Sequence, residues 1–194
     1  MATDLRTRRI MNDLKDFNEG LNGIILTSAE DLSVLEVALA GPPDTPFETG
    51  TFNIEITIPR RFPFSSPTMT FTTKVWHPNI SKRGRICMDV LDRNWNSGIT
   101  LIECAEAARA LLNDPNPDSP LNVDAANLLE ENKNMYELNA KLWTRIYAGG
   151  SLSAVELEER LSVLIALGLN EEEAALKGAE SRWNIQSIIE ACNL

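Results

Sequence analysis

Histidine and cysteine are scarce in this chain, which has one histidine and three cysteines among its 194 residues. With His77 as the sole imidazole, a cysteine nucleophile has no dedicated base unless His77 itself serves. Cys87, Cys104 and Cys192 are scattered, without the C-x-x-C spacing of a zinc site or the density of a secreted disulfide scaffold. We therefore expect no metal site and a reducing compartment, the cytoplasm or the nucleus.

A surplus of basic residues and long apolar runs are also lacking. The formal net charge is -10, whereas nucleic-acid binding needs an excess of lysine and arginine. No stretch approaches the roughly 18 apolar residues of a membrane span. Charged Asp4 and Arg6 stand where a signal peptide would have an apolar core. We expect a soluble protein that binds neither nucleic acid nor a membrane.

The hydrophobic pattern predicts an α+β domain over residues 1–148. Apolar residues recur at helical spacing in residues 3–17. Four later runs alternate between apolar and polar residues and are separated by Gly- and Pro-rich breaks, as in an antiparallel meander. The predicted strands cover residues 23–26, 35–39, 52–58 and 69–71.

Helical patterns fill the second half of the chain. Thr100 and Glu103 have the spacing of a capping box at the start of a helix over residues 101–112. The Ala148-Gly149-Gly150-Ser151 break ends the domain, so we assign residues 149–153 to a linker. Residues 154–194 predict a compact three-helix bundle. The later helices are expected at residues 123–132, 134–147, 154–167, 171–179 and 185–191.

The turn His77-Pro78-Asn79 precedes Cys87 across a short basic loop, Ser81-Lys82-Arg83-Gly84-Arg85. A thiol without a strong base attacks amides poorly but exchanges acyl groups readily with another thiol. Such an exchange has a free-energy change near zero and mainly needs positioning and stabilisation of an oxyanion. The pattern therefore favours thioester chemistry over proteolysis, with the Asn79 amide as the oxyanion donor.

Several motifs of residues 1–148 together resemble those of ubiquitin-conjugating enzymes. They are Gly41-Pro42-Pro43-Asp44-Thr45-Pro46-Phe47-Glu48-Thr49-Gly50, Phe62-Pro63-Phe64, His77-Pro78-Asn79 before Cys87, Trp95, and Asp114-Pro115-Asn116-Pro117-Asp118-Ser119-Pro120-Leu121. Residues 154–194 are similar to a ubiquitin-associated (UBA) domain, with Leu167-Gly168-Leu169 in place of its first-loop Met-Gly-Phe. The chain thus resembles the subclass that includes the Huntingtin-interacting conjugating enzyme. This implies the conjugating fold followed by a three-helix UBA bundle.

The resemblance implies a role for each residue near the cysteine. Cys87 would accept ubiquitin as a thioester from the activating enzyme and yield it to a lysine. Asn79 would either stabilise the oxyanion or order the loop that does so, and His77 would hydrogen-bond within its own loop rather than act as the general base. Where many members have an aspartate, this chain has Ser119. Either Asp118 orients the lysine, or Ser119 is an uncharged partner whose phosphorylation restores a negative charge.

The resemblance also implies partners and a product. The expected partners of this monomeric enzyme are ubiquitin, the activating enzyme and RING or HECT-type ligases, and the expected product is a lysine-48-linked chain. No cofactor is expected, because the activating enzyme consumes the ATP. The implied contact residues are Arg8 and Arg9 for the activating enzyme, Phe64, Trp95, Asn96 and Ser97 for ligases, and Leu167, Gly168, Leu169, Ile188 and Ile189 for ubiquitin. Two alternatives stay open, an inactive ubiquitin-binding scaffold and conjugation of a ubiquitin-like modifier.

Overall fold

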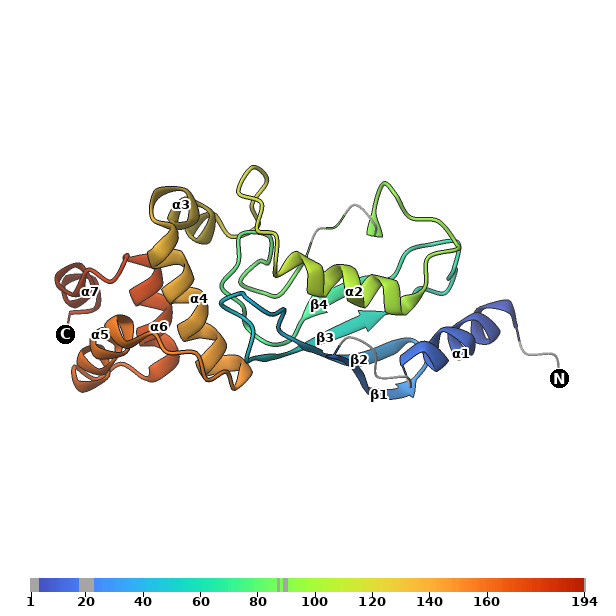
Figure 1. Ribbon diagram of the computed structural model, residues 1–194, viewed down its shortest axis with the longest axis horizontal. Coiled ribbons are helices and arrows are strands. Elements are labelled where there is room, and N and C mark those ends of the chain that lie inside the picture. The colour runs from blue at the N-terminus through green and yellow to red at the C-terminus, as the bar shows by residue number, and fades with distance from the viewer. Residues whose placement is uncertain (1–3, 18–22, 87, 89–90, 194) are drawn as a thin grey trace.

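The structure, a computed structural model, describes residues 4–17, 23–86, 88 and 91–193. In this part of the chain an antiparallel sheet in the order β1-β2-β3-β4 lies between α1 at one end and helices α3 to α7 at the other (Figure 1). The predicted N-terminal helix and four-stranded meander are confirmed. The elements are α1 (Leu5–Phe17), β1 (Ile24–Asp31), β2 (Val34–Ala40), β3 (Thr51–Thr57), β4 (Thr68–Phe71), α2 (Leu101–Leu111), α3 (Val123–Glu131), α4 (Lys133–Ala148), α5 (Val155–Ala166), α6 (Glu171–Glu180) and α7 (Ile185–Cys192).

One face of the sheet is buried because side chains alternate between the two faces of each strand. Phe52, Ile54 and Ile56 of β3 point into the core, while the residues between them are exposed or half-buried. Helix α2 packs into the same core (Figure 1). It begins with the predicted capping box, in which the side chains of Thr100 and Glu103 each accept a hydrogen bond from the other's backbone N–H.

Helix α4 joins the core around the sheet to the C-terminal helices. On one side, Trp143 packs against Trp76 with ring centroids 5.2 Å apart. On the other side, Leu142 belongs to the apolar core of residues 154–193, which we call the tail. Helices α5, α6 and α7 of the tail lie at the three predicted positions. Among the described helices, none combines the length and apolar character needed to cross a membrane.

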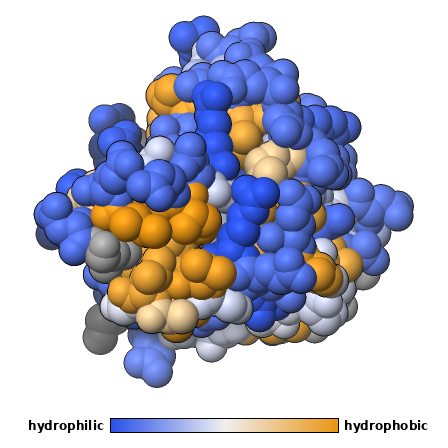
Figure 2. Space-filling view, turned by 90° about the vertical axis from the view of Figure 1, so that its left-hand side faces the viewer, coloured by the Kyte–Doolittle hydropathy of each residue, from blue (hydrophilic) through white to orange (hydrophobic). Residues whose placement is uncertain are grey.

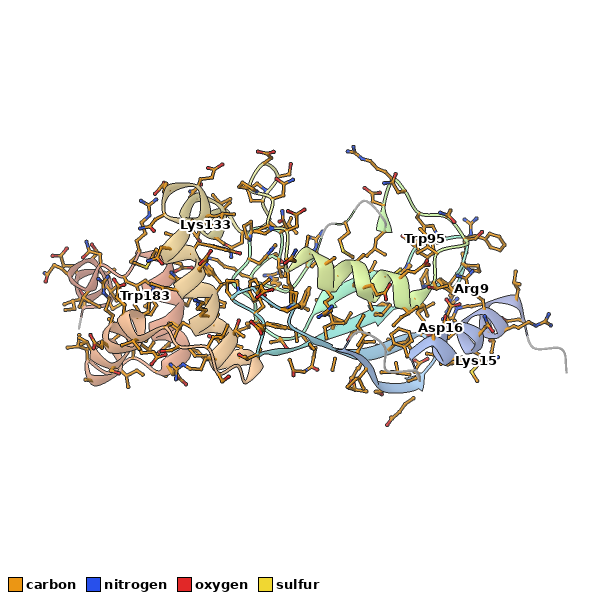
Figure 3. All side chains as sticks on the ribbon, in the orientation of Figure 1. Arg9, Lys15, Asp16, Trp95, Lys133 and Trp183 are labelled. Atoms are coloured by element: carbon orange, nitrogen blue, oxygen red, sulfur yellow. The ribbon has the colours of Figure 1, made fainter. Side chains whose placement is uncertain are left out.

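The tail packs against α4 through Trp183, which lies in the turn between α6 and α7 (Figure 3). Its indole Nε1–H donates to Asn139 Oδ1 of α4 at 2.9 Å, and both side chains are buried. The ring lies against Gly178, where a Cβ atom would come within 2.7 Å of it. Three exposed ion pairs also join the tail to the rest of the chain: Lys74 to Glu172, Lys82 to Glu180 and Arg182 to Glu131.

Candidate active site

The His77-Pro78-Asn79 turn follows Trp76, a few residues after the end of β4, and His77 and Asn79 are buried. His77 Nδ1 accepts a hydrogen bond from the backbone N–H of Asn79 at 3.1 Å. Burial lowers the pKa of His77 to about 3, and the backbone of Leu111 offsets part of this effect. A ring that is neutral at physiological pH and bonded within its own turn fits a structural role better than that of a general base.

Asn79 ties this turn to a second segment that is distant in the sequence. Its Nδ2 donates to the carbonyl of Asn116 at 2.7 Å, and its Oδ1 accepts from the backbone N–H of Asn116 at 2.8 Å. The Pro78 carbonyl accepts from the backbone N–H groups of Leu121 and Asn122 at 2.8 and 2.9 Å. Asn79 is only 8% exposed, whereas Asn116 is exposed, so the two bonds between them are partly buried. Residues 114–122 are therefore fixed beside the turn at both ends.

Asp118 and Ser119 lie between these two attachment points, and both are exposed. The backbone N–H of Asp118 donates to Asn116 Oδ1 at 2.9 Å, which continues the polar network begun by Asn79. The two side chains thus have defined backbone positions and open access to solvent.

Cys87 lies outside the described residues, but the segment that leads to it is well defined. Ile86 pairs in an antiparallel bridge with Ile80, the residue that follows Asn79. The intervening turn is held by Gly84, whose carbonyl accepts from the N–H of Phe71 at 2.9 Å. Gly84 has φ of 78°, and a Cβ there would come within 1.8 Å of the Phe71 carbonyl oxygen. The backbone before Cys87 is thereby pinned to the edge of the sheet.

Comparison with known proteins identifies the family. The family model of ubiquitin-conjugating enzymes matches residues 9–144. The chain belongs to the ubiquitin-conjugating enzyme family. It is 36% identical to Homo sapiens ubiquitin-conjugating enzyme E2 K over 162 residues, which are 83% of this chain and 81% of that protein. It is also 36% identical to Arabidopsis thaliana ubiquitin-conjugating enzyme E2 27 over 167 residues, 84% of this chain and 85% of that one.

Solved structures agree with this assignment. A ubiquitin-conjugating enzyme E2 domain of Toxoplasma gondii matches with a TM-score of 0.69 at 36% identity and covers 73% of this chain and 97% of its own. The protein is therefore a ubiquitin-conjugating enzyme, which acts through a thioester intermediate. Membership of the family implies ubiquitin, an activating enzyme and ligases as its general partners.

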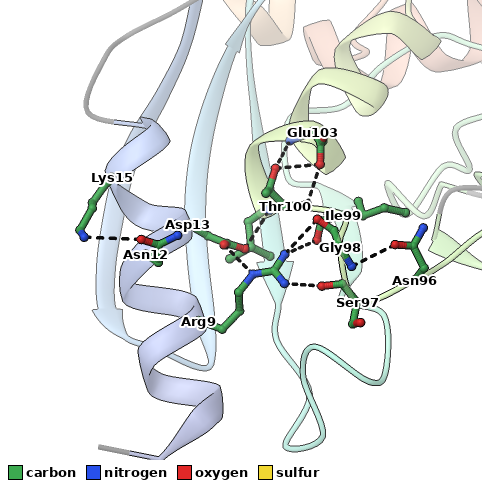
Figure 4. Close-up of polar contacts among 11 residues, drawn as sticks. Arg9, Asn12, Asp13, Lys15, Asn96, Ser97, Gly98, Ile99, Thr100 and Glu103 are labelled. Atoms are coloured by element: carbon green, nitrogen blue, oxygen red, sulfur yellow. Dashed lines mark hydrogen bonds and ion pairs between the residues drawn. The ribbon is translucent and has the colours of Figure 1, made fainter.

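The two residues predicted to contact the activating enzyme, Arg8 and Arg9, lie in different environments. Arg8 is exposed, whereas the guanidinium of Arg9 is bound within the protein (Figure 4). Arg9 pairs with buried Asp13 at 2.7 Å and donates to the carbonyls of Ser97, Gly98 and Ile99. Asp13 also accepts from the N–H of Leu101 at the start of α2, and burial raises its pKa. Arg9 thus holds the loop before α2, and its guanidinium is not a free surface charge.

The predicted ligase-contact residues lie at the same end of the conjugating enzyme. Phe64 is 67% exposed, which is unusual for so large an apolar side chain. The indole N–H of Trp95 donates to the Pro63 carbonyl at 3.0 Å, so the loop of Trp95 is joined to that of Phe64. Asn96 and Ser97 are exposed beside it. The structure brings these four residues together around one surface.

The predicted ubiquitin-contact residues of the tail are divided by burial. Leu167 is 39% exposed, Gly168 is exposed with φ of 107°, and Leu169 and Ile189 are half-buried. Figure 2 views this end of the molecule and shows apolar surface among hydrophilic side chains. Ile188, however, is 1% exposed and belongs to the tail core. The expectation that Ile188 contributes to a surface is therefore wrong, since its side chain faces the neighbouring helices.

The other two cysteines do not resemble a reactive thiol. Cys104 is buried in α2, and burial raises its pKa to about 12, so it stays protonated at neutral pH. Cys192 is half-buried in the last helix. Within the described residues, no group of three or more His, Cys, Asp or Glu side chains is arranged to hold a metal ion.

Sequence reasoning missed two residues that shape these surfaces. Asp13 was an unremarked polar residue of the first helix, yet it links Arg9 to the start of α2. Asn139 gave no sign that it would bind Trp183, which lies 44 residues further along the chain. A polar residue on the apolar side of a helical pattern is the one available signal in both cases, and it does not name the partner.

Proposed function

We propose that this conjugating enzyme carries ubiquitin as a thioester on Cys87 and transfers it to lysine, building lysine-48-linked chains. The supporting observation is the double hydrogen bond between Asn79 and Asn116. It joins the turn to the segment that carries the exposed residues Asp118 and Ser119. The Ile80–Ile86 bridge brings the segment that precedes Cys87 beside the same turn.

The proposed reaction consists of two successive acyl transfers. In the first step, the Cys87 thiolate attacks the thioester that joins ubiquitin to the activating enzyme, and the cysteine of that enzyme leaves as a thiolate. In the second step, a lysine amine attacks the new thioester through a tetrahedral oxyanion, an isopeptide bond forms, and the Cys87 thiolate leaves and regains a proton. One thioester replaces another in the first step, so its free-energy change is near zero.

The surrounding residues have distinct proposed roles in the second step. Asn79 is the proposed oxyanion donor: its Nδ2 donates one hydrogen to the Asn116 carbonyl at 2.7 Å, and its second N–H is the one proposed to donate to the oxyanion. The same bond supports the alternative role of ordering the loop. Asp118, or Ser119 once phosphorylated, is the proposed group that orients the lysine. His77 stays neutral and holds the turn.

The proposed partner surfaces follow from exposure. Arg8 is the proposed basic contact for the activating enzyme, with Arg9 acting indirectly by holding the loop before α2. Phe64 and the loop of Trp95, Asn96 and Ser97 form the proposed docking surface for RING or HECT-type ligases. The enzyme itself is proposed to be a monomer of the cytoplasm and nucleus that needs no cofactor, because ATP is used by the activating enzyme.

We further propose that the tail is a UBA domain that binds ubiquitin. The segment Leu167-Gly168-Leu169 joins α5 to α6 and is turned toward solvent, while Trp183 attaches the tail to α4. Binding of ubiquitin would therefore not require the tail to leave the catalytic domain. A ubiquitin held there is at high effective concentration near Cys87, which favours extension of chains over their initiation.

The test is to incubate the enzyme with activating enzyme, ATP and ubiquitin, followed by electrophoresis without reductant. Wild-type protein should gain a ubiquitin adduct that a thiol reductant removes, and Cys87→Ala should not. Cys104→Ala and Cys192→Ala are the matched controls and should form the adduct normally. An adduct on Cys87→Ala, or none on the wild type, would reject the proposal. Replacement of lysine 48 of ubiquitin should then abolish chains but not the thioester.

A further inference from the structure

The guanidinium of Arg9 lies between helix α1 and the loop of residues 96–99, which precedes α2 (Figure 4). Its two terminal nitrogens donate to three successive backbone carbonyls of this loop, and the bond to Ile99 is 2.6 Å long. The other bonds of the loop are local, such as those from the N–H groups of Gly98 and Ile99 to Asn96. Within the described residues, Arg9 therefore supplies every hydrogen bond that joins this loop to a segment distant in the sequence.

Arg9 also contacts the other half of the proposed ligase-docking surface. Its guanidinium carbon lies 5.6 Å from the centroid of the Phe62 ring, which is the geometry of a cation–π contact. Phe62 is buried and packs against Trp95, with ring centroids 6.1 Å apart. Two residues after Phe62 the chain reaches exposed Phe64, and Figure 3 shows Arg9 and Trp95 at the same end of the molecule. One side chain thus contacts both loops that form this surface.

Asp13 holds the guanidinium of Arg9 in this position. The Asp13 side chain is 1% exposed, and its two oxygens have different partners. Oδ1 accepts from Arg9 Nε at 2.7 Å, and Oδ2 accepts from the N–H of Leu101 at 3.2 Å. An arginine side chain has many rotamers, so ordering it costs conformational entropy. A buried carboxylate fixed to the first residue of α2 offsets that cost, because it binds Nε and leaves both terminal nitrogens for the loop carbonyls.

The buried position of Asp13 keeps it from touching a docking protein, so any effect on docking passes through Arg9. A surface made of two loops binds more tightly when the loops already have their bound arrangement, because less ordering is needed on binding. We propose that Asp13 is a positioning residue for ligase docking, which acts through Arg9 to keep the loops of Phe64 and Trp95 in one arrangement. The inference rests on the proposed docking surface for ligases.

The experiment measures single-turnover discharge of ubiquitin from the preloaded thioester onto free lysine, at increasing concentrations of a RING-domain ligase that is active with the wild-type enzyme. Asp13→Asn keeps the shape of the side chain and removes its charge, so the half-saturating ligase concentration should rise about ten-fold. The rate at saturating ligase and the ligase-free rate should both stay within about two-fold of wild type. A side chain that only stabilised the fold would not produce this separation.

Three further variants sharpen the test. Asp16→Asn makes the same chemical change at an exposed position of the same helix and should leave the half-saturating concentration unchanged. Asp13→Glu keeps a negative charge beside Arg9 and should recover most of the lost affinity. Arg9→Lys keeps the ion pair with Asp13 but lacks the planar fork that reaches several carbonyls, so it should also raise the half-saturating concentration. It replaces Asp13→Asn in the test if circular dichroism shows that Asp13→Asn is unfolded.

A half-saturating concentration within about two-fold of wild type for folded Asp13→Asn or Arg9→Lys would overturn the inference. An equal fall in ligase-free discharge would overturn it too, since that marks a general defect of the enzyme. Phe64→Ala separates this inference from the proposed function on which it rests. That variant should lose the response to the ligase, and if it responds as the wild type does, the proposed docking surface itself is wrong.

Discussion

The His77-Pro78-Asn79 turn and the tail interface both join segments that are far apart in the sequence, but they do so with different contacts. At the turn, Asn79 and Pro78 bind backbone groups of residues 116–122 in a partly buried setting. At the tail, one buried side-chain bond between Trp183 and Asn139 is accompanied by three exposed ion pairs.

The difference matters because buried and exposed polar contacts differ in strength. A buried hydrogen bond is costly to break, since the remaining partner stays unsatisfied, whereas an exposed ion pair contributes about 0–1 kcal/mol. The turn is therefore a fixed frame for chemistry. The attachment of the tail to α4 is therefore stabilised mainly by the Trp183 side chain and its apolar neighbours. The exposed ion pairs contribute less to the stability of this interface.

The largest expected effect is at the turn. Asn79→Ala removes the proposed oxyanion donor and leaves both backbone groups of Asn116 without their partner, so we expect discharge onto free lysine to slow about 100-fold or more. Single-turnover discharge of the preloaded thioester measures this. Asn127→Ala, at an exposed position of α3, is the matched control and should discharge normally. A rate within about three-fold of wild type would remove both proposed roles of Asn79.

At the tail, Trp183→Phe should lower the free energy of unfolding by about 1–3 kcal/mol, because Asn139 Oδ1 is left buried without a donor. Urea unfolding followed by circular dichroism measures the loss. Trp183→Phe/Asn139→Leu removes both polar partners and should recover most of it. If the single variant is as stable as wild type while high salt detaches the tail, the ion pairs hold the interface and the comparison must be reversed.

A pH effect should distinguish the buried turn from the exposed interface. Unfolded histidine has a pKa near 6.5 and folded His77 has a pKa of about 3, so below pH 6.5 the unfolded chain binds a proton that the folded chain does not. The contribution of His77 to stability is complete above pH 6.5 and falls by about 1.4 kcal/mol per pH unit below it, or about 2 kcal/mol at pH 5.

His77→Asn keeps an acceptor for the Asn79 N–H and removes the titration. Its free energy of unfolding, measured in urea between pH 7 and pH 5, should therefore decline less steeply than that of the wild type. Parallel pH profiles for the two proteins would contradict the assignment of a buried neutral ring.

Much of the fold could be predicted because its signals are local. The Thr100 and Glu103 capping box and the alternating strands each involve residues only a few positions apart. Where a signal was missing, the prediction fell short. The first predicted strand ended at residue 26, whereas β1 continues to Asp31 because pairing with β2 carries it through polar residues.

The candidate site was predictable in its parts but not in its contacts. The residues of the turn could be named from the sequence, yet the bond from Asn79 to the Asn116 backbone spans 37 positions. Ile188 and Ile189 are both isoleucines. They lie on different sides of α7 because successive residues of a helix are rotated by about 100°. The sequence pattern alone cannot say which of the two faces the core. Likewise, the sequence does not show that the side chain of Arg9 donates to backbone carbonyls about 90 residues further along the chain.

Gly84 restricts which amino acid substitutions the loop before Cys87 can accept. A side chain at that position would collide with the carbonyl of Phe71, so the position is closed to the other amino acids unless the sheet edge shifts. The neighbouring positions 82, 83 and 85 have no such restriction on their charge. Mutation at these positions therefore changes the charge of the loop while its backbone shape is inherited intact.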